Sequence, residues 1–500
     1  MAKPQTGVAL TLSTSRSEME EHGAGIGFAK WLLAVLLMVA VTAVISDGQT
    51  FKVLANFDGT NGSQPFATLL QGTDGKFYGT SLSGGTYATG TVFNITPDGV
   101  LTAMHSFCAQ NGCPDGREAR TAPIQASDGN YYGTTTFGGI DNNYGTVFRV
   151  TPTGGRLTTI YRFCTQPNCT DGAGVYGSVI QARDGNLYGT TNLGGDVTCY
   201  PPYGCGTVFR LTSAGVLTTL HRFHSADGAF PFAGLVQAND GSFYGTTANG
   251  GAYGYGAVFK ITPAGKLTTL YSFCAQPPYC TDGSLSYSQL IQATDGNFYG
   301  TTETGGTVGF GTVYKITPNG VLTTLHSFGI SDGSDPNSAL VQATDGSFYG
   351  TTYAGGNINV GTAFKITREG TLTTLLNFGS ETMGSGYPSG LIQATDGNFY
   401  GTTQTGGASN DGTAFSLSAG LGAFVKTQPS SGKAGAKIII LGTDLTGTTS
   451  VTFNGTPAIF TVVSKSEITT NVPVGATTGK VKVVTPKQTL LSNLPFRVRP

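Results

Sequence analysis

The segment Asp295-Gly-Asn-Phe-Tyr-Gly-Thr301 is one of seven copies of the heptapeptide Asp-Gly-x-[Phe/Leu/Tyr]-Tyr-Gly-Thr in this chain. The spacings between successive copies run from 50 to 56 residues, and the copies begin at Asp74, Asp128, Asp184, Asp240, Asp295, Asp345 and Asp396. Self-similarity at this period is typical of a propeller or a solenoid, in which each repeat is one supersecondary unit. The heptapeptide therefore predicts a repeat architecture.

Each repeat contains four extended segments. Around Asp295 they are residues 289–293, 298–302, 311–317 and 322–328, all rich in Thr, Val, Ile, Tyr and Phe. Such runs, bounded by Gly, Pro, Asn and Asp, indicate strands. The Asp-Gly pair predicts a type I′ hairpin between the first two strands, and Pro-x-Gly predicts a tight turn between the last two. Four antiparallel strands without helical periodicity correspond to one propeller blade.

The two ends of the repeat array indicate how the ring closes. Six repeats finish with a fourth strand that begins Leu-Thr-[Thr/Ala], but the seventh stops after residues 412–417. The missing strand is found at the other end of the chain, in residues 51–57, which are followed by Asp58-Gly59 as in the other repeats. We therefore predict an all-β, seven-bladed β-propeller over residues 47–420. Its last blade takes its outer strand from the N-terminal segment, which leaves no unpaired sheet edge.

At the level of the repeat, the chain resembles the GloVer-type (Gloeo/Verruco) tandem-repeat proteins of bacteria. The resemblance covers residues 51–418 and depends on the recurring segments Asp-Gly-x-Phe-Tyr-Gly-Thr-Thr, Gly-Thr-Val-Phe-x-Ile-Thr-Pro and Leu-Thr-Thr-Leu. That family has no general assigned chemistry, so the resemblance implies a repeat fold and no particular activity.

Residues 424–500 lack the repeat and resemble an IPT/TIG domain. The segments that carry the resemblance include Val451-Thr-Phe-Asn-Gly455 and Val472-Pro-Val-Gly-Ala476. The family implies an immunoglobulin-like β-sandwich, and the short strands separated by Gly and Pro turns fit that fold. This segment holds nine Lys/Arg and two acidic residues, whereas the rest of the chain holds 18 and 26. A basic domain could contact an anionic surface; solubilising lysines on strand exteriors are the simpler interpretation.

Residues 1–46 contain an export signal or an anchor. Lys30 precedes an apolar run over residues 31–45, which is short for a membrane span and suits the core of a signal peptide. Acidic residues at Glu18, Glu20 and Glu21 depart from a plain basic leader. We therefore expect a secreted or cell-surface protein whose signal peptide is cleaved, with membrane anchoring by residues 31–45 as the alternative.

The eight cysteines form four close pairs: Cys108/Cys113, Cys164/Cys169, Cys199/Cys205 and Cys274/Cys280. An even number, local pairing and an export signal together predict four disulfides. Zinc is the competing interpretation, but zinc-binding cysteines usually have two to four residues between them. These pairs have four or five, so no metal site is expected.

Strand parity places all four cysteine pairs on one face of the propeller. Successive antiparallel strands alternate in direction, so inter-blade links and second-to-third loops share one face, here called the loop face. The opposite face, with the first-to-second and third-to-fourth turns, is called the hairpin face. The loop face also collects eight aromatic residues, Tyr200, Tyr203, Phe230, Phe232, Tyr253, Tyr255, Tyr279 and Tyr287. They either form a ligand-binding surface or pack on the disulfides.

Two recurring polar positions are interpreted as structural. His105, His221 and His326 share one repeat position with Tyr161, Tyr271 and Leu376, so we interpret the position as a packing site. An Asp-Gly pair recurs in six inter-blade links, at Asp58, Asp115, Asp171, Asp227, Asp282 and Asp332. Calcium needs six to eight converging oxygens, so turn formation by Asp is the better interpretation.

No motif for a nucleophile, an acid pair, a phosphate loop or a metal triad is found, and no cofactor is expected. The polar residues that break the repeat are few: Arg117, Glu118, Arg120, Arg183, Glu303, Arg368 and Glu381. The leading hypothesis is an exported bacterial binding protein whose propeller takes a carbohydrate or protein ligand, without catalysis. Nucleic acid is not expected, because the chain carries an export signal. The alternative is a propeller enzyme that acts on polysaccharide, a lyase or a glycosidase, with Arg117, Glu118 and Arg120 as candidate residues.

Overall fold

The computed structural model describes residues 49–139, 143–275, 279–379 and 386–499. The expected leader over residues 1–46 and the repeat-breaking Glu381 lie outside these residues. The described chain is built from strands, with one short 3-10 turn at Pro167–Cys169. Within it, no helix is both long enough and apolar enough to cross a membrane.

Seven four-stranded antiparallel sheets make up the repeat region, and each is one blade of the propeller, numbered here by its heptapeptide. The first strands are β2 (Leu70–Gln71), β6 (Ile124–Gln125), β10 (Ile180–Gln181), β14 (Val236–Gln237), β18 (Ile291–Gln292), β22 (Val341–Gln342) and β26 (Ile392–Gln393). The second strands are β3 (Phe77–Thr80), β7 (Tyr131–Thr135), β11 (Leu187–Thr191), β15 (Phe243–Thr247), β19 (Phe298–Thr302), β23 (Phe348–Thr352) and β27 (Phe399–Thr403).

The outer half of each blade is equally regular. The third strands are β4 (Thr91–Ile95), β8 (Thr146–Val150), β12 (Thr207–Leu211), β16 (Ala257–Ile261), β20 (Thr312–Ile316), β24 (Thr362–Ile366) and β28 (Thr413–Ser418). The fourth strands are β5 (Leu101–Ser106), β9 (Leu157–Arg162), β13 (Leu217–Arg222), β17 (Leu267–Ser272), β21 (Leu322–Ser327) and β25 (Leu372–Asn377), with β1 (Thr50–Asn56) completing blade 7.

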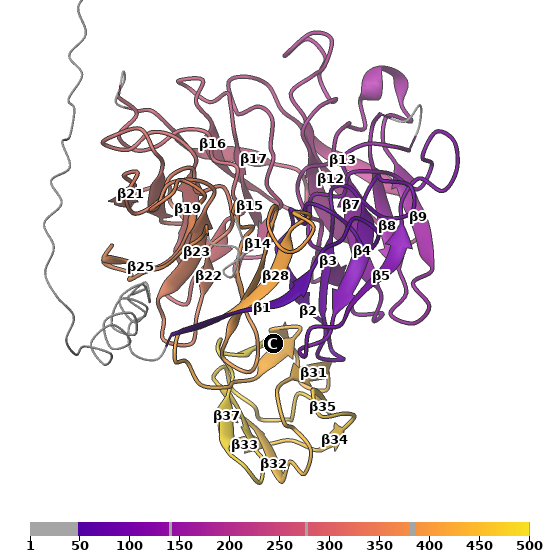
Figure 1. Ribbon diagram of the computed structural model, residues 1–500, viewed down its shortest axis with the longest axis vertical. Coiled ribbons are helices and arrows are strands. Elements are labelled where there is room, and N and C mark those ends of the chain that lie inside the picture. The colour runs from indigo at the N-terminus through magenta and orange to yellow at the C-terminus, as the bar shows by residue number, and fades with distance from the viewer. Residues whose placement is uncertain (1–48, 140–142, 276–278, 380–385, 500) are drawn as a thin grey trace, which may run out of the picture. The chain divides into compact units, whose positions relative to one another are not determined.

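The predicted closure by the N-terminal strand is confirmed. In Figure 1, β1 in indigo lies beside β28 in orange, and the two strands pair antiparallel from Thr50 opposite Ser418 to Asn56 opposite Thr413. Blade 7 also stacks on blade 1, because the rings of Tyr400 and Phe77 are 4.1 Å apart. The sheets therefore form a closed ring.

Inside a blade, the heptapeptide fixes the hairpin and the packing of the second strand. The Tyr188 hydroxyl donates a hydrogen bond to the Asp184 carboxylate at 2.8 Å. The glycine after Tyr188 has no room for a side chain, since a Cβ on Gly189 would lie 2.7 Å from Phe209 Cζ. All seven heptapeptides repeat the tyrosine–aspartate bond.

The turn itself differs from the type I′ prediction. The second residue of the pair, Gly185, has φ +84°, but Asp184 is not among the residues with positive φ. The Gly185 N–H donates to the Ala182 carbonyl at 2.9 Å, as in a type I turn followed by a left-handed glycine. The Asp184 carboxylate also accepts the Asn186 N–H at 3.1 Å. We attribute the turn type to these side-chain bonds.

Between blades, the same motifs supply two complete rings of hydrogen bonds. The glutamine of each first strand accepts a backbone N–H from the preceding blade, and the ring closes where Thr395 donates to Gln71 at 3.0 Å. The first threonine of each Tyr-Gly-Thr donates to a carbonyl of the next blade, for example Thr190 to Ala233 at 2.8 Å. Each blade is therefore bonded to both of its neighbours.

The C-terminal region is a sandwich of two four-stranded sheets, ordered β29-β31-β35-β34 and β33-β32-β36-β37, with a short parallel pair β30–β38. Its strands are β29 (Lys426–Gln428), β30 (Ser431–Gly432), β31 (Lys437–Leu441), β32 (Ser450–Phe453), β33 (Thr456–Pro457), β34 (Phe460–Val462), β35 (Glu467–Asn471), β36 (Val481–Val484), β37 (Thr489–Leu491) and β38 (Arg497–Val498). Residues such as Ile440, Phe453 and Val483 form its buried core.

Hydrogen bonds join this sandwich to the hairpin face of the propeller. The Ser466 hydroxyl donates to the Thr73 carbonyl at 2.9 Å, and the Gln428 amide donates to the Gln125 carbonyl at 2.6 Å. Thr73 and Gln125 belong to the first-strand ends of blades 1 and 2. The loop face, which carries the inter-blade links, is not involved in these contacts.

Candidate functional site

The inter-blade links enter the ring through a left-handed residue at a fixed repeat position. In blades 1 to 6 it stands ten residues before the heptapeptide aspartate, with φ between +51° and +63°, at Gln64, Glu118, Gly174, Phe230, Leu285 and Asp335. In blade 7, Tyr387 takes this conformation, with φ +58°. Such a conformation is uncommon for residues other than glycine and is found where surrounding contacts enforce it, often at functional sites.

The contacts that enforce this conformation are backbone hydrogen bonds to two blades. The Phe230 N–H donates to the Cys205 carbonyl of the preceding blade at 3.0 Å, and the Phe230 carbonyl accepts the Ala248 N–H of its own blade at 3.1 Å. The corresponding residues of the other blades make the same pair of bonds. The link backbone is therefore fixed without help from the side chain at this position.

Two residues further on, the chain reaches a central cavity of about 360 Å³. One residue of each blade, eight before the heptapeptide aspartate, contributes to its wall, and we call this set the rim ring: Phe66, Arg120, Tyr176, Phe232, Tyr287, Asn337 and Pro388. The wall also includes Glu303 and Gln404, at the ends of second strands. Because second strands end at the loop face, the cavity belongs to that face.

Aromatic rings and one guanidinium group form an arc through blades 1 to 5 of the cavity wall. The Tyr176 ring contacts Phe232 edge to face at 5.0 Å, and Phe232 contacts Tyr287 in the same way at 4.8 Å. The arc extends through Arg120, whose guanidinium carbon lies 5.7 Å from the Phe66 ring centroid and 5.5 Å from that of Tyr176. Five adjacent blades thus supply four rings and one cation.

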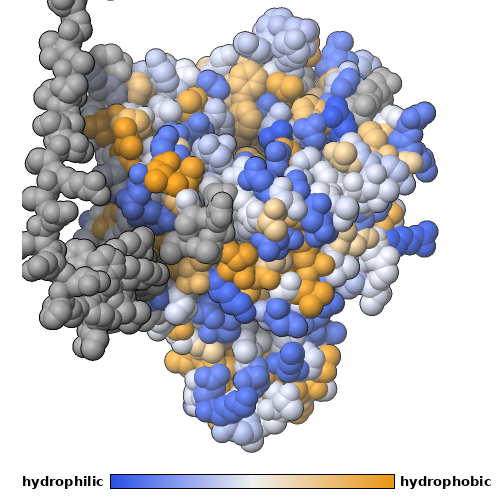
Figure 2. All heavy atoms as spheres, in the orientation of Figure 1, coloured by the Kyte–Doolittle hydropathy of each residue, from blue (hydrophilic) through white to orange (hydrophobic). Residues whose placement is uncertain are grey.

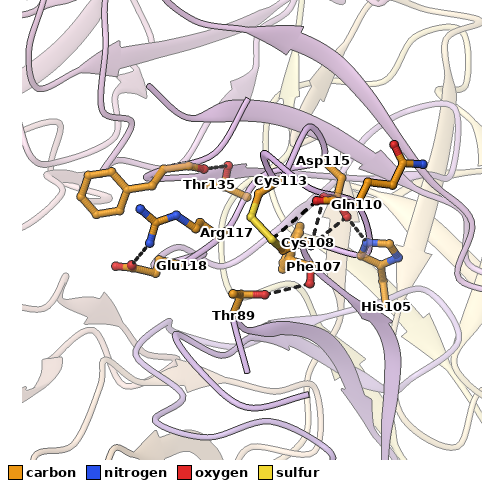
Figure 3. Close-up of a disulfide and its surroundings, with 11 residues drawn as sticks. Thr89, His105, Phe107, Cys108, Gln110, Cys113, Asp115, Arg117, Glu118 and Thr135 are labelled. Atoms are coloured by element: carbon orange, nitrogen blue, oxygen red, sulfur yellow. Dashed lines mark hydrogen bonds and ion pairs between the residues drawn. A yellow bond between two sulfur atoms is a disulfide. The ribbon is translucent and has the colours of Figure 1, made fainter. Parts of the chain in front are cut away.

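The cation in this arc shares its carboxylate partner. Glu118 lies 2.7 Å from Arg117 and 3.4 Å from Arg120, so one negative charge serves two guanidinium groups. All three side chains are about three-quarters buried, and Figure 3 shows the Arg117–Glu118 pair beside a disulfide. The Glu118 carboxylate therefore lies between the two guanidinium groups.

Two carboxylates stand on the far side of the ring, in blades 5 and 6, which are the blades farthest from blade 2. Burial, and secondarily the neighbouring Asp335, raises the pKa of Glu303. Burial also raises the pKa of Asp335. Burial, and secondarily Glu303, raises the pKa of Tyr287. Among the described residues, neither carboxylate has an ion-pair partner.

Four disulfides are present, with the predicted partners: Cys108–Cys113, Cys164–Cys169, Cys199–Cys205 and Cys274–Cys280. Figure 3 shows the first of them in its link. In three of the pairs the second cysteine accepts an N–H from the Gly-Gly loop, as Cys113 does from Gly139 at 2.9 Å. In the fourth pair, the Cys205 carbonyl accepts the N–H of Phe230, as described above. The disulfides therefore stiffen the loops that hold the links.

The eight aromatic residues expected on the loop face fall into three groups. Phe232 and Tyr287 line the cavity. Tyr200, Tyr203 and Phe230 form a separate cluster, with Phe230 and Tyr200 5.2 Å apart, beside Cys199–Cys205. Tyr253, Tyr255 and Tyr279 are exposed, Tyr279 to 77%. The first group fits a binding site, and in the second group Tyr200 and Tyr203 are also exposed, to 54% and 58%.

Sequence reasoning missed Phe66 and Tyr176. It named Arg120 as a candidate residue of the polysaccharide-acting alternative and Glu303 only as a departure from the repeat. The offset that Phe66, Tyr176 and Arg120 share, eight residues before the heptapeptide aspartate, is regular, but variability does not single it out, because the position nine residues before the aspartate also holds five residue types in seven blades.

The shared His/Tyr position proves to be more than a packing site. His221 Nε2 lies 2.9 Å from the Asp227 carboxylate of the next link, and the Tyr271 hydroxyl donates to Asp282 at 2.7 Å. Figure 3 shows the same arrangement for His105 and its aspartate. Histidine and tyrosine are interchangeable here because both reach the same carboxylate. Each aspartate also accepts a backbone N–H, as expected for turn formation. Within the described chain, no three His, Cys, Asp or Glu side chains converge as a metal site.

Two other hollows of about 590 Å³ each are present, one lined by residues such as His221 and His224 and one in the C-terminal sandwich lined by residues such as Ile459 and Val474. Figure 2 shows hydrophobic residues in small groups among hydrophilic ones. The most exposed hydrophobic side chains, Ile459 and Val474, belong to the C-terminal sandwich. Scattered exposed apolar residues are ordinary for a protein surface.

The model of the Gloeobacter/Verrucomicrobia repeat matches residues 40–239, 113–288 and 235–457, and the IPT/TIG domain model matches residues 424–498. No curated protein matches. The oligogalacturonate lyase from Vibrio parahaemolyticus is 10% identical with a TM-score of 0.44, covering 74% of this chain and 96% of that one. TolB from Acinetobacter baumannii is 12% identical with a TM-score of 0.37, and the match covers 79% of this chain and 70% of TolB. The chain belongs to the Gloeobacter/Verrucomicrobia repeat family and carries a C-terminal IPT/TIG domain.

Proposed function

We propose that this protein is an exported carbohydrate-binding protein that takes its ligand in the central cavity of the loop face. The observation that carries the proposal is the arc of four aromatic rings in that cavity, built from rim-ring residues of blades 1, 3, 4 and 5 with Arg120 of blade 2 between the first two rings. Sugars present apolar C–H faces that stack on aromatic rings, and aromatic side chains dominate binding energy at many recognition sites.

The rest of the cavity supports a polar, compact ligand. Asn337 and Gln404 offer amide groups that can both donate and accept hydrogen bonds to hydroxyls, while the Gln289 amide already donates to the Leu235 carbonyl at 2.7 Å. The volume of about 360 Å³ lies at the lower end of the usual range for small-molecule sites. Such a cavity accommodates one or two sugar units, with the remainder of a chain leaving through the loop face.

Export is the second component of the proposal. Four disulfides are typical of proteins that fold in oxidising compartments, and no free cysteine remains among the described residues. N-terminal sequencing of protein recovered outside the cytoplasm would test it. A new N-terminus near Ser46 supports export by cleavage, whereas a retained leader supports anchoring and recovery only from the cytoplasm contradicts export.

A glycan array on purified residues 47–500, followed by calorimetry on the glycans that bind, tests the ligand class. We expect Phe232→Ala to weaken binding by about fivefold or more, which corresponds to about 1 kcal/mol for a central aromatic contact. Tyr279→Ala is the matched control, because Tyr279 is an exposed aromatic on the same face outside the cavity wall.

Three results would contradict parts of this proposal. Absence of binding to every glycan would exclude carbohydrate as the ligand. An equal effect of the Phe232 and Tyr279 substitutions would place the site elsewhere on the loop face. Release of shortened or unsaturated products would establish the alternative, a polysaccharide-acting enzyme.

A further inference from the structure

Three arginines come together where the C-terminal sandwich meets the hairpin face of the propeller. Arg183 belongs to the turn between the first two strands of blade 3, and Arg497 and Arg499 lie in and just after β38. The Arg497 N–H donates to the Ser430 carbonyl at 3.0 Å, and the Arg499 N–H donates to the Gly432 carbonyl at 2.9 Å. Because they are two residues apart along one extended segment, the two arginine side chains lie on the same side of it.

Two of these guanidinium groups meet at one oxygen atom. The Asn239 carbonyl, in the first-to-second turn of blade 4, accepts Arg183 Nη1 at 3.5 Å and Arg497 Nη1 at 3.1 Å. Burial, and then the charges of Arg499 and Arg497, lower the pKa of Arg183, so all three positive charges act on one another. We call Arg183, Arg497 and Arg499 the arginine site.

No carboxylate balances the arginine site within the described chain. None of its three members forms an ion pair with a described residue. The charge of Asp240 acts on Arg183, but the Asp240 carboxylate lies 2.8 Å from Lys260 Nζ. Like charges held together repel one another, and this repulsion is relieved when a ligand brings negative charge to the site.

A second, independent observation is an unused hydrogen-bond donor. The Nε atom of Arg499 is buried and has no hydrogen-bond partner among the described residues. A buried donor without an acceptor is costly, and each such group in a folded protein calls for an explanation. A ligand oxygen at this position would satisfy it.

We infer that the arginine site binds a phosphate or sulfate group. Guanidinium groups bind such oxyanions through paired hydrogen bonds, and a tetrahedral anion presents oxygens in several directions, which suits donors that come from both the propeller and the sandwich. Arg183 and Arg497 are exposed, so a free anion and an anionic substituent of a polysaccharide can both reach them. The site lies apart from the residues of the loop-face cavity, so it is independent of the ligand proposed there.

Calorimetry with inorganic sulfate and inorganic phosphate, in chloride of matched ionic strength, tests the site. We expect Arg499→Gln to lower affinity about tenfold, as for the loss of one charged hydrogen bond. This variant is the most informative, because no hydrogen bond or ion pair of the Arg499 side chain to a described residue is lost with it. Arg497→Lys should keep part of the affinity, because lysine retains the charge without the planar fork.

A polymer and a control variant complete the experiment. Dextran sulfate that binds more tightly per sulfate group than inorganic sulfate would indicate a polysaccharide-borne group, and equal affinity per group would indicate the free anion; uncharged dextran is the reference. Arg156→Gln is the charge-matched control, because Arg156 is exposed on a third-to-fourth turn of the same hairpin face. It should leave the affinity for sulfate unchanged.

Two results would overturn the inference. The first is absence of binding by sulfate and phosphate at millimolar concentration. The second is an affinity that Arg499→Gln and Arg183→Gln leave unchanged, or that Arg156→Gln lowers as much as they do, since it would mean that any binding follows the overall charge. A blank glycan array would count against the loop-face proposal alone, because it does not probe inorganic anions at the arginine site.

Discussion

Substituting Phe57 by alanine tests whether the N-terminal strand closes the ring in solution. Phe57 follows β1 and is fully buried, and its ring contacts Phe93 of blade 1 edge to face at 5.0 Å. Its N–H donates to the Gly412 carbonyl of blade 7 at 3.0 Å. The residue therefore stands where the two ends of the repeat array meet.

The expected magnitude follows from the burial of a whole aromatic side chain. Truncating a fully buried phenylalanine to alanine costs about 3–5 kcal/mol, because transfer energy is lost and a cavity is left behind. Phe223 is the internal standard, since it occupies the same repeat position within continuous chain. It is equally buried, contacts Phe259 edge to face at 5.2 Å and donates to the Gly206 carbonyl at 3.0 Å. If closure holds, the two substitutions should destabilise the protein to a similar extent.

Guanidinium unfolding of residues 47–500, followed by tyrosine fluorescence, measures both variants against the parent. A loss of about 3–5 kcal/mol for Phe57→Ala and for Phe223→Ala is expected. Destabilisation by Phe223→Ala alone would refute closure, because it would mean that β1 detaches without cost. Removing residues 47–57 should expose the edge of β28 and promote aggregation, and a truncated protein as stable and monomeric as the parent would refute closure as well.

Three further outcomes are expected, each measured by thermal or chemical unfolding. His221→Tyr should leave stability unchanged, because tyrosine at this position bonds the corresponding link aspartate in other blades. His221→Leu should cost about 1 kcal/mol, because it removes a partner of Asp227. Equal melting temperatures of the two variants would contradict this. Gly245→Ala should cost at least about 1–3 kcal/mol, since its Cβ would lie 2.6 Å from Phe259 Cζ, and a neutral effect would contradict the packing. Desolvation lowers the pKa of Lys426 from 10.5 to about 8, so between pH 8 and 10.5 the folded state binds fewer protons than the unfolded chain, and the free energy of unfolding should rise with pH across that window. Lys426→Met should abolish the rise. Persistence of the same rise in that variant would exclude this lysine as its source.

The fold was predictable because its determinants repeat. The heptapeptide at Asp184 and its six copies specify a hairpin, a tyrosine–aspartate bond and a side-chain-free glycine, and every copy points to the same blade. Closure was predictable because the fourth strand missing from blade 7 is found at residues 51–57. The turn type was not, because the choice between two hairpin turns depends on hydrogen bonds that the Asp184 carboxylate makes after folding.

The site was only partly predictable, for the opposite reason. Residues of the rim ring, such as Phe66 and Tyr176, differ from blade to blade, so no sequence motif identifies them. Arg120 and Glu303 are 183 positions apart in the sequence, and only the closed ring brings them to one cavity. The hydrogen bond between His221 and Asp227 of the next link could not be predicted either. Link lengths vary, and strand periodicity does not show which loop residue will lie opposite a given strand residue.

The threonine and glutamine bonds between blades bear on how such proteins diversify. Both kinds of bond end on main-chain atoms of the neighbouring blade, so these bonds form whatever side chains the neighbour carries, whereas the stacked rings between blades, such as Tyr400 and Phe77, depend on both partners. A gene of this kind can duplicate a repeat, recombine two repeats or transfer one from a related gene as long as the stacked ring positions are kept. Ligand preference and scaffold integrity are thus inherited separately, and selection can alter the first while it leaves the second untouched.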